Sequence, residues 1–210
     1  MTLRNYTVED FSSLVASNAP APGGGSCAAL LGALGAALTA MTAALTQGRK
    51  KYAAFEENAA RVQAECEAVR EALLALMQRD TEAFRTVSDA YAMPKQTQAQ
   101  LDCRSAAIQR ALRLCTGTPL EMMRCANEAL ELAASLSDGY NVSAASDLGV
   151  AFLAMGAALR GAWLNVRINL ASISDEAFVR EAAEQAQALL QQGLRLSEDG
   201  YARVLRTIEG

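Results

Sequence analysis

The stretch from Pro20 to Gln47 constrains this chain more than any other feature. It opens with Pro-Ala-Pro and three glycines, and then continues without a charged residue as far as Gln47. Small residues recur at a spacing of four, in two adjacent rows: Ala28, Gly32, Ala36 and Ala40, then Ala29, Ala33 and Ala37. Residues four apart lie on one face of a helix. The pattern therefore predicts a central helix that neighbouring helices can approach very closely.

The start of this helix is a candidate binding loop. We expect Ser26 to cap the helix and the segment Gly23, Gly24 and Gly25 to present free backbone amides at its positive end, where an anion is stabilised. A nucleotide loop is excluded, because no Lys follows the glycines and no strand precedes them. The residues leave two alternatives open: a binding site for an anion or carboxylate, and a plain tight turn.

The remaining sequence predicts an all-α, single-domain bundle of six or seven helices over residues 1–210, around the small-residue central helix. Only four prolines occur, and no run alternates apolar with polar residues as a strand would. Thr118-Pro119-Leu120-Glu121 has the form of a helix start, with a capping Thr and Pro at the first position. We expect a short helix that begins at Thr7, and we expect the central helix to end near Gly48. Further helices are expected over about 51–92, 96–115, 118–137, 142–173 and 174–207, the last with possible breaks at Gly193 and Gly200.

Composition excludes several classes of function. The net charge of −4 argues against a nucleic-acid partner. Histidine is missing, which excludes His as a general base or metal ligand, so carboxylates, Lys, Tyr, Cys, Ser or backbone amides must carry any chemistry. The five cysteines contain no C-x-x-C pair, so we expect neither disulfides nor a zinc site, and no metal.

The cellular setting follows from the same reading. The N-terminus lacks the apolar core of a signal peptide. Residues 27–45 are long enough to cross a membrane, but Ala and Gly dominate them and Arg and Lys follow. We therefore expect a cytoplasmic protein with no membrane contact.

Asp80 is the most informative single position. The apolar residues of the helix over 51–92 recur at alternating steps of three and four, and Asp80 continues this seam between Leu76 and Phe84. A carboxyl group on such a seam is desolvated or lines a cavity, and desolvation raises its pKa toward the range useful for proton transfer. The alternative is a structural role, in which Asp80 pairs with a buried Arg or caps a neighbouring helix.

Two further charged features are weaker candidates. Asp147 lies at the start of the most apolar late helix, where an acid often serves only to offset the helix dipole. The basic run Arg49, Lys50 and Lys51 is either a solvated helix junction or a clamp for an anion.

Taken together, these motifs resemble the cyclodeaminase domain of formiminotransferase-cyclodeaminase. The resemblance covers nearly the whole chain. The residues that carry it are Pro20–Ser26 with the helix that follows, Gly48–Tyr52, Asp80, Met93-Pro94-Lys95, Ser146–Ala151 and Asn165–Asn169.

The resemblance implies an all-helical homodimer that acts on tetrahydrofolate derivatives as substrates, with no tightly bound cofactor. One branch of the family closes 5-formimino-tetrahydrofolate to 5,10-methenyl-tetrahydrofolate with loss of ammonia. The other interconverts the methenyl and 10-formyl forms, and the motifs do not separate the two branches. We expect the cyclodeaminase, with the cyclohydrolase as the alternative and a non-enzymatic, dimeric helical ligand-binding protein as a second alternative.

The resemblance also suggests roles for residues. Asp80 matches the residue associated with cyclodeaminase catalysis, and we expect it to act as the acid and base. The glycine loop Gly23–Ser26 would bind polar or anionic parts of the folate. We expect the further substrate-binding residues to be Arg49, Lys50, Lys51, Lys95, Asp147 and Asn165.

Overall fold

The computed structural model describes residues 2–210 as one bundle of six α-helices and three short 3₁₀ turns, with no strand in that part of the chain. The all-α prediction is confirmed. The elements are η1 (Leu3–Asn5), α1 (Val8–Val15), α2 (Gly24–Thr46), η2 (Lys50–Phe55), α3 (Glu56–Ala92), α4 (Gln98–Leu136), η3 (Val142–Ala144), α5 (Ala145–Leu170) and α6 (Glu176–Glu209).

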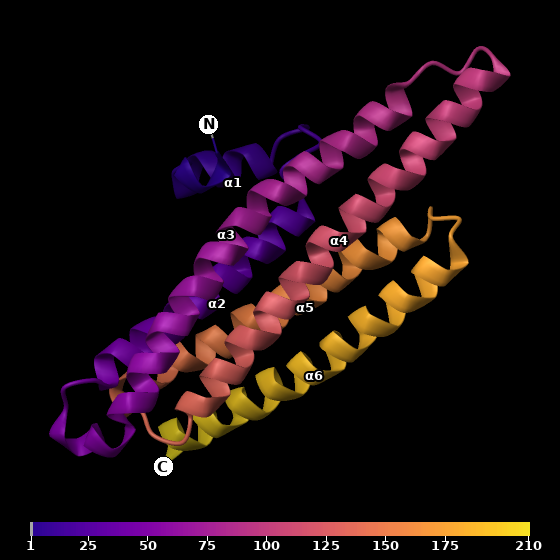
Figure 1. Cartoon of the computed structure of the whole chain (residues 1–210). Coiled ribbons are helices and arrows are strands. Elements are labelled where there is room, and N and C mark those ends of the chain that lie inside the picture. The colour runs from indigo at the N-terminus through magenta and orange to yellow at the C-terminus, as the bar shows by residue number, and fades with distance from the viewer. Residues whose placement is uncertain (1) are drawn as a thin grey trace.

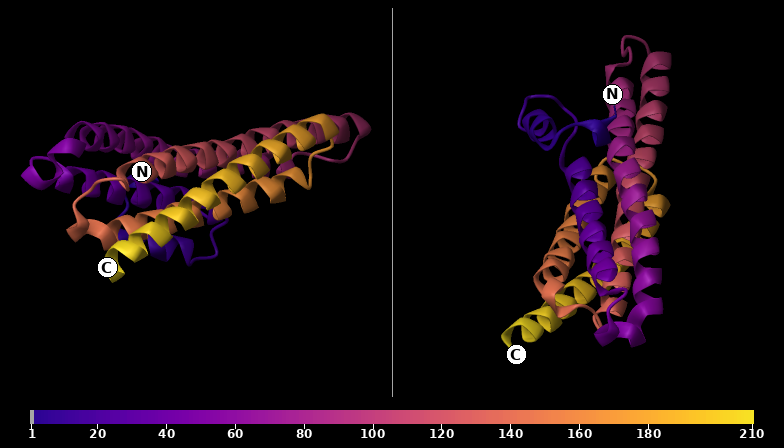
Figure 2. Two further views of the ribbon diagram at one scale, coloured as in Figure 1. Left: turned by 90° about the horizontal axis from the view of Figure 1, so that it is seen from below. Right: turned by 90° about the vertical axis from the view of Figure 1, so that its left-hand side faces the viewer.

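Two long antiparallel hairpins frame the molecule. α3 and α4 form the first, and its tip extends beyond the other helices, while α5 and α6 form the second (Figure 1). α2 packs against both α3 and α5, and α1 lies to one side of the bundle (Figure 2). Thr7 caps α1 at the predicted helix start, and the Asp175 side chain caps α6 by accepting a hydrogen bond from the Phe178 amide.

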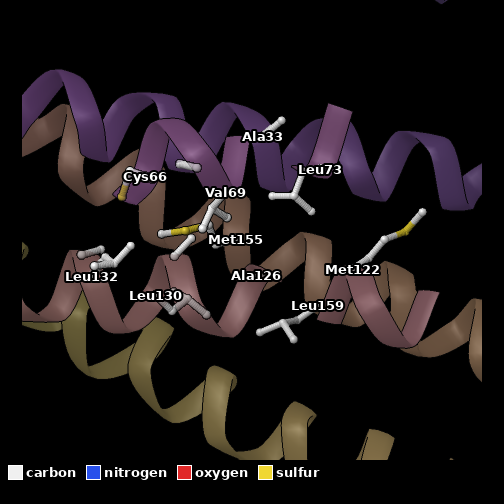
Figure 3. Packing of buried hydrophobic residues seen from close by; sticks show 14 of the residues in the cluster. Ala33, Cys66, Val69, Leu73, Met122, Ala126, Leu130, Leu132, Met155 and Leu159 are labelled. Carbon is white, nitrogen blue, oxygen red and sulfur yellow. The ribbon is translucent and has the colours of Figure 1, made fainter. Parts of the chain in front are cut away.

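The central helix α2 buries its small residues and exposes its large ones. Ala29 and Ala36 are fully buried, whereas Leu31 and Leu34 reach solvent. Seams of glycine and alanine let α3 and α5 approach the α2 backbone: a Cβ on Gly32 would lie 3.2 Å from a methyl group of Leu73. Figure 3 shows Leu73 and Met155 among the buried side chains that lie between the helices. The predicted central packing role is confirmed.

α2 and the segment from Val142 to Leu170 are also long and apolar enough to cross a membrane by length and composition. In this fold more than half of each such window is buried against other helices. Core helices of a bundle have this composition because they are apolar on most sides.

The predicted helix start at Thr118-Pro119 is wrong. α4 runs without a break from Gln98 to Leu136, with Pro119 inside it. Proline has no N–H, so the carbonyl of Cys115, four residues earlier, loses its helical donor. That carbonyl instead accepts a hydrogen bond of 3.1 Å from Asn169 Nδ2 on α5. Tertiary contact thus compensates a sequence signal that in isolation favours two helices.

The predicted breaks at Gly193 and Gly200 are also wrong. α6 continues through both residues, because each glycine makes room for a side chain from the core rather than for a turn. A Cβ on Gly200 would overlap the ring of Phe152, and one on Gly193 would overlap Leu159. Both of these partners are fully buried on α5.

This packing predicts opposite effects for two Gly→Ala substitutions. Gly200→Ala should lower the free energy of unfolding by about 1–3 kcal/mol, because the Phe152 ring must shift in a packed core. Gly117→Ala, in α4 with no atom within 4 Å of the position that the new methyl group would take, should raise it by about 0.5–1 kcal/mol. Urea unfolding of both variants checks the pair, and a stabilised Gly200→Ala protein would contradict the close contact.

Candidate active site

A cleft opens where the glycine end of α2 meets α3, α4 and α5. Its volume is about 370 Å³, within the range of small-ligand sites. The lining is mainly apolar or backbone, with a few polar groups that converge on the space. The residues are Pro20, Ala21, Gly23, Gly24, Gly25, Asp80, Phe84, Leu112, Cys115, Asn165, Ile168, Asn169 and Ser172.

The contact between α2 and α3 at this cleft requires a glycine. The carboxyl group of Asp80 lies so close to Gly25 that an added Cβ would overlap it, with Cγ only 2.6 Å away. Gly25 is buried, and it occupies the first turn of α2. The glycine loop therefore serves to admit the Asp80 carboxyl group to the helix end.

Ser26 does not cap α2, and this part of the prediction is wrong. Gly23 occupies the cap position, and Ser26 lies inside the first turn with its side chain fully buried. The serine hydroxyl reaches α3 instead, 3.0 Å from Asp80 Oδ2 and 3.1 Å from the Met77 carbonyl. It is also 3.3 Å from the Thr81 hydroxyl.

These contacts let Ser26 serve both protonation states of Asp80. A hydroxyl has one proton to donate and lone pairs that accept. When Asp80 is ionised, Ser26 donates to its carboxylate. When Asp80 is neutral, the acid can donate to Ser26 Oγ while Ser26 donates to the Met77 carbonyl. A proton can therefore enter or leave Asp80 without leaving a buried polar group unpaired.

The surroundings of Asp80 raise the pKa of its carboxyl group. Burial raises the pKa of Asp80, and hydrogen bonds from the Ser26 side chain and backbone offset part of this effect. Burial also raises the pKa of the Cys27 and Cys115 thiols, and the charge of Asp80 adds to it. These thiols therefore stay protonated at neutral pH, and Asp80 is the lining group suited to exchange a proton.

Two asparagines on α5 form the wall that faces the glycines. Asn165 and Asn169 are half-buried and lie one turn apart. The Asn165 side chain approaches α2, with its Nδ2 3.7 Å from the position of a Cβ on Gly24. Asn165 was predicted at this site, whereas Asn169 was missed as a site residue, although its spacing of four from Asn165 already placed both on one helix face.

Comparison with known proteins shows the family of the chain. The family model for formiminotransferase-cyclodeaminase matches residues 7–188. The chain belongs to this family. It is 40% identical over 200 residues to the methenyltetrahydrofolate cyclohydrolase of Methylorubrum extorquens, covering 95% of this chain and 96% of that protein.

Two further relatives extend the comparison. The mouse formimidoyltransferase-cyclodeaminase is 32% identical over 191 residues, and the matched region spans 91% of this chain but 35% of the mouse protein. The crystal structure of formiminotetrahydrofolate cyclodeaminase from Thermotoga maritima superposes with a TM-score of 0.83 at 29% identity, covering 99% of this chain and 98% of that one. The predicted resemblance and the all-helical fold are confirmed.

The fold brings together only some of the residues predicted for the site. Gly23, Gly24, Gly25, Asp80 and Asn165 line the cleft, and Ser26 contacts Asp80. No comparison assigns a role to any of them, so their functions stay predictions.

The basic run and Asp147 lie at the opposite end of α2. Arg49, Lys50 and Lys51 follow its last turn, about 35 Å from the glycines by the rise of an α-helix. Asp147 is in the first turn of α5. This turn lies beside the C-terminal end of α2, where the backbone N–H of Asn141 donates a hydrogen bond to the hydroxyl of Thr46. A single chain therefore does not bring these residues to Asp80.

Lys95 lies elsewhere again. It is exposed in the loop at the tip of the α3–α4 hairpin, and α3 continues about 18 Å beyond Asp80 before reaching that tip. Within one chain, Lys95 cannot contact a ligand held against Asp80 unless that ligand extends along the hairpin.

The raised pKa of Asp80 predicts a pH-dependent gain in stability for Asp80→Asn. An aspartate in the unfolded chain ionises near pH 3.9, whereas Asp80 in the folded protein ionises at a higher pH. The free energy of unfolding therefore falls as pH rises from about 3.9 through the pKa of Asp80 in the folded state. At pH 7.5 the variant should melt above the wild type, by about 2–4 °C per kcal/mol of burial cost removed. The difference should vanish toward pH 4.

Thermal unfolding between pH 4 and 8 measures this effect. Asp89→Asn is the matched control, because Asp89 is an exposed aspartate on the same helix. A destabilised Asp80→Asn protein at neutral pH would show that the ionised carboxylate makes a net favourable interaction in the fold.

Proposed function

We propose that this protein is a folate one-carbon enzyme, a formimino-tetrahydrofolate cyclodeaminase in which Asp80 is the acid and base. The observation that carries the proposal is the half-buried Asp80 carboxyl group, which has a raised pKa, faces an open cleft and is bonded to Ser26. A general acid and base works best when its pKa is near the operating pH. The family membership supplies the substrate class.

The reaction needs one proton to move from one nitrogen to another. N10 of the folate attacks the carbon of the protonated formimino group on N5, and a tetrahedral intermediate with a neutral amino group forms. Ionised Asp80 accepts the proton that N10 releases, and then donates it to the amino group, which departs as ammonia. The C–N bond to ammonia breaks, the 5,10-methenyl cation remains, and Asp80 ends ionised. The proposal needs no cofactor beyond the folate itself.

Charge also favours this assignment. Among the cleft-lining residues in the described chain, Asp80 is the one with a formal charge. The protonated formimino group and the methenyl product are both cationic, so an ionised carboxylate beside them is favoured electrostatically. The apolar wall that includes Phe84 and Leu112 strengthens this attraction by excluding water.

The cyclohydrolase is a second candidate, favoured by the 40% identity to the Methylorubrum protein over nearly the full length of both chains. In this reaction Asp80 accepts a proton from water as the oxygen attacks the methenyl carbon. The bond from that carbon to N5 then breaks as Asp80 returns this proton to N5, the remaining hydroxyl proton passes to solvent, and 10-formyl-tetrahydrofolate is released. Both reactions pass through a tetrahedral carbon between N5 and N10, so one carboxyl group suits either.

Replacement of the proposed acid and base tests this function. Asp80→Asn should lower kcat by at least about 100-fold on whichever substrate the wild type uses, because the amide cannot exchange a proton. Ammonia release from 5-formimino-tetrahydrofolate and loss of the near-ultraviolet absorbance of 5,10-methenyl-tetrahydrofolate measure the two activities.

The controls separate catalysis from folding. Asp89→Asn should keep wild-type rates. A folded Asp80→Asn protein that retains wild-type rates on both substrates would refute the role of Asp80. A wild-type protein inactive on both would leave the non-enzymatic ligand-binding alternative.

We also propose that the protein is a homodimer that pairs through α2 and α5. The small residues of these helices face inward, so an apolar strip remains on the surface. Exposed apolar residues on this face, here called the α2/α5 face, are Leu31, Leu34, Met41, Leu45, Val150, Leu153, Leu164 and Ile168. Large apolar side chains exposed on two neighbouring helices favour association, and a second copy offers the same side chains in a two-fold arrangement.

Such a pairing would account for the distant basic run. With a two-fold axis near the middle of α2, the two copies of α2 run antiparallel. The end of one copy that carries Arg49, Lys50 and Lys51 then lies beside the glycine end of the other. In this arrangement the run would meet the anionic glutamate tail of a folate bound in the second copy's cleft.

A charge placed on the face tests the dimer. Leu34→Glu should shift the sedimentation coefficient at micromolar concentration from dimer to monomer, because an ionised carboxylate would be desolvated in the interface. Leu114→Glu is the control, since Leu114 is similarly exposed but lies on α4, away from the face. A monomeric wild type would refute the proposal.

A further inference from the structure

The side chain of Asn169 is held in one orientation by the proline in α4. Pro119 removes the helical donor of the Cys115 carbonyl, and Asn169 supplies a donor from α5 at 3.1 Å. A carbonyl only accepts, so the amide atom that faces Cys115 must be Nδ2. The Asn169 Oδ1 atom therefore occupies the other branch of the amide.

Asn165 is fixed in the same sense by a different partner. Its Nδ2 donates to the Gly161 carbonyl at 2.8 Å, which leaves its Oδ1 on the opposite branch. Within residues 2–210, no donor reaches the Oδ1 of either asparagine, and neither oxygen is enclosed by protein. Both side chains line the cleft, so this wall offers two unpaired acceptors to whatever binds there.

The two acceptors differ in kind from Asp80. A neutral amide oxygen accepts a hydrogen bond but does not take up the proton at working pH. It therefore suits donors that persist through the reaction rather than the nitrogen that gives up its proton. A tetrahydrofolate carries two such donors side by side, the 2-amino group and N3–H of its pyrimidine ring, away from the reacting N5 and N10.

We propose that Asn169, with Asn165 beside it, is a specificity-determining residue whose Oδ1 accepts a hydrogen bond from the 2-amino group on the pyrimidine ring of the folate. This inference rests on the proposed function for its substrate. Opposite these acceptors, the first turn of α2 presents the backbone amides of its glycines. The cleft thus pairs an acceptor wall with a donor wall, which matches a ring edge that carries N–H groups next to a carbonyl.

The expected effect of Asn169→Ala falls on binding. The hydrogen bond exists equally in the bound substrate and in the transition state, so its loss should raise KM by about 10-fold or more and change kcat little. The loss should disappear for a ligand that lacks the donor. This selectivity separates substrate recognition from a structural role of the bond to Cys115.

The experiment compares two ligands across variants. The dissociation constants of 5-formyl-tetrahydrofolate and of its analogue with a 2-methyl in place of the 2-amino group are measured by isothermal titration calorimetry. Asn169→Ala should weaken binding of the parent ligand about 10-fold or more and that of the analogue less than about threefold. For each protein, the dissociation constant of the analogue is divided by that of the parent ligand. Both constants come from the same protein sample, so a partly unfolded fraction does not affect their ratio.

Asn58→Ala is the matched control. Its Nδ2 also donates from one helix to a backbone carbonyl of another, Ser135 at 3.0 Å, but away from the cleft. It should weaken neither ligand selectively. Equal weakening of both ligands by Asn169→Ala, or no weakening of either, would overturn the inference. Because the readout is binding, it is independent of the turnover assay that decides the proposed function.

Discussion

The contact between Gly25 and Asp80 is the constraint on which this site depends. A carboxyl group occupies the space that any other side chain at position 25 would fill, so α2 and α3 meet with almost nothing between them but this acid. The approach is possible because the buried face of α2 consists of Ala, Gly, Ser and Thr along its whole length. The close contact desolvates Asp80 and raises its pKa. The close packing of α2 against α3 and the raised pKa of Asp80 thus both follow from the small residues of α2.

That composition has a second consequence on the outside of the molecule. A helix that buries its small residues must expose its large ones, and α2 exposes leucines where most bundle helices would present charges. α5 does the same beside it, with Leu153 more than half exposed. The feature that lets the acid sit against the helix start therefore also creates an apolar surface beside the cleft, and links the site to the proposed dimer interface.

The sequence predicted the fold class, the packing role of α2 and the position of Asp80 on a helix seam, because each follows from local periodicity. It failed where tertiary contacts override local signals. Pro119 has the form of a helix start, and only the bond from Asn169 across to Cys115 shows why the helix continues. Gly193 and Gly200 favour breaks in isolation, and only Leu159 and Phe152 show why they pack instead. The basic run and the cleft adjoin opposite ends of α2, a separation that the length of the predicted helix already implied.

The wrongly predicted helix ends and the candidate site have a common physical origin. A proline inside α4 and glycines inside α2 and α6 each weaken a helix locally, and in each case a neighbouring element uses the position. At Pro119 the freed carbonyl holds an asparagine at the cleft, and at Gly25 the missing side chain admits the carboxyl group. At these positions, unlike at Gly117, a residue that is unfavourable for its own helix makes room for a neighbouring helix or frees a hydrogen-bonding group for it. Two of those places border the same cleft, which is the strongest structural reason to regard it as the functional centre.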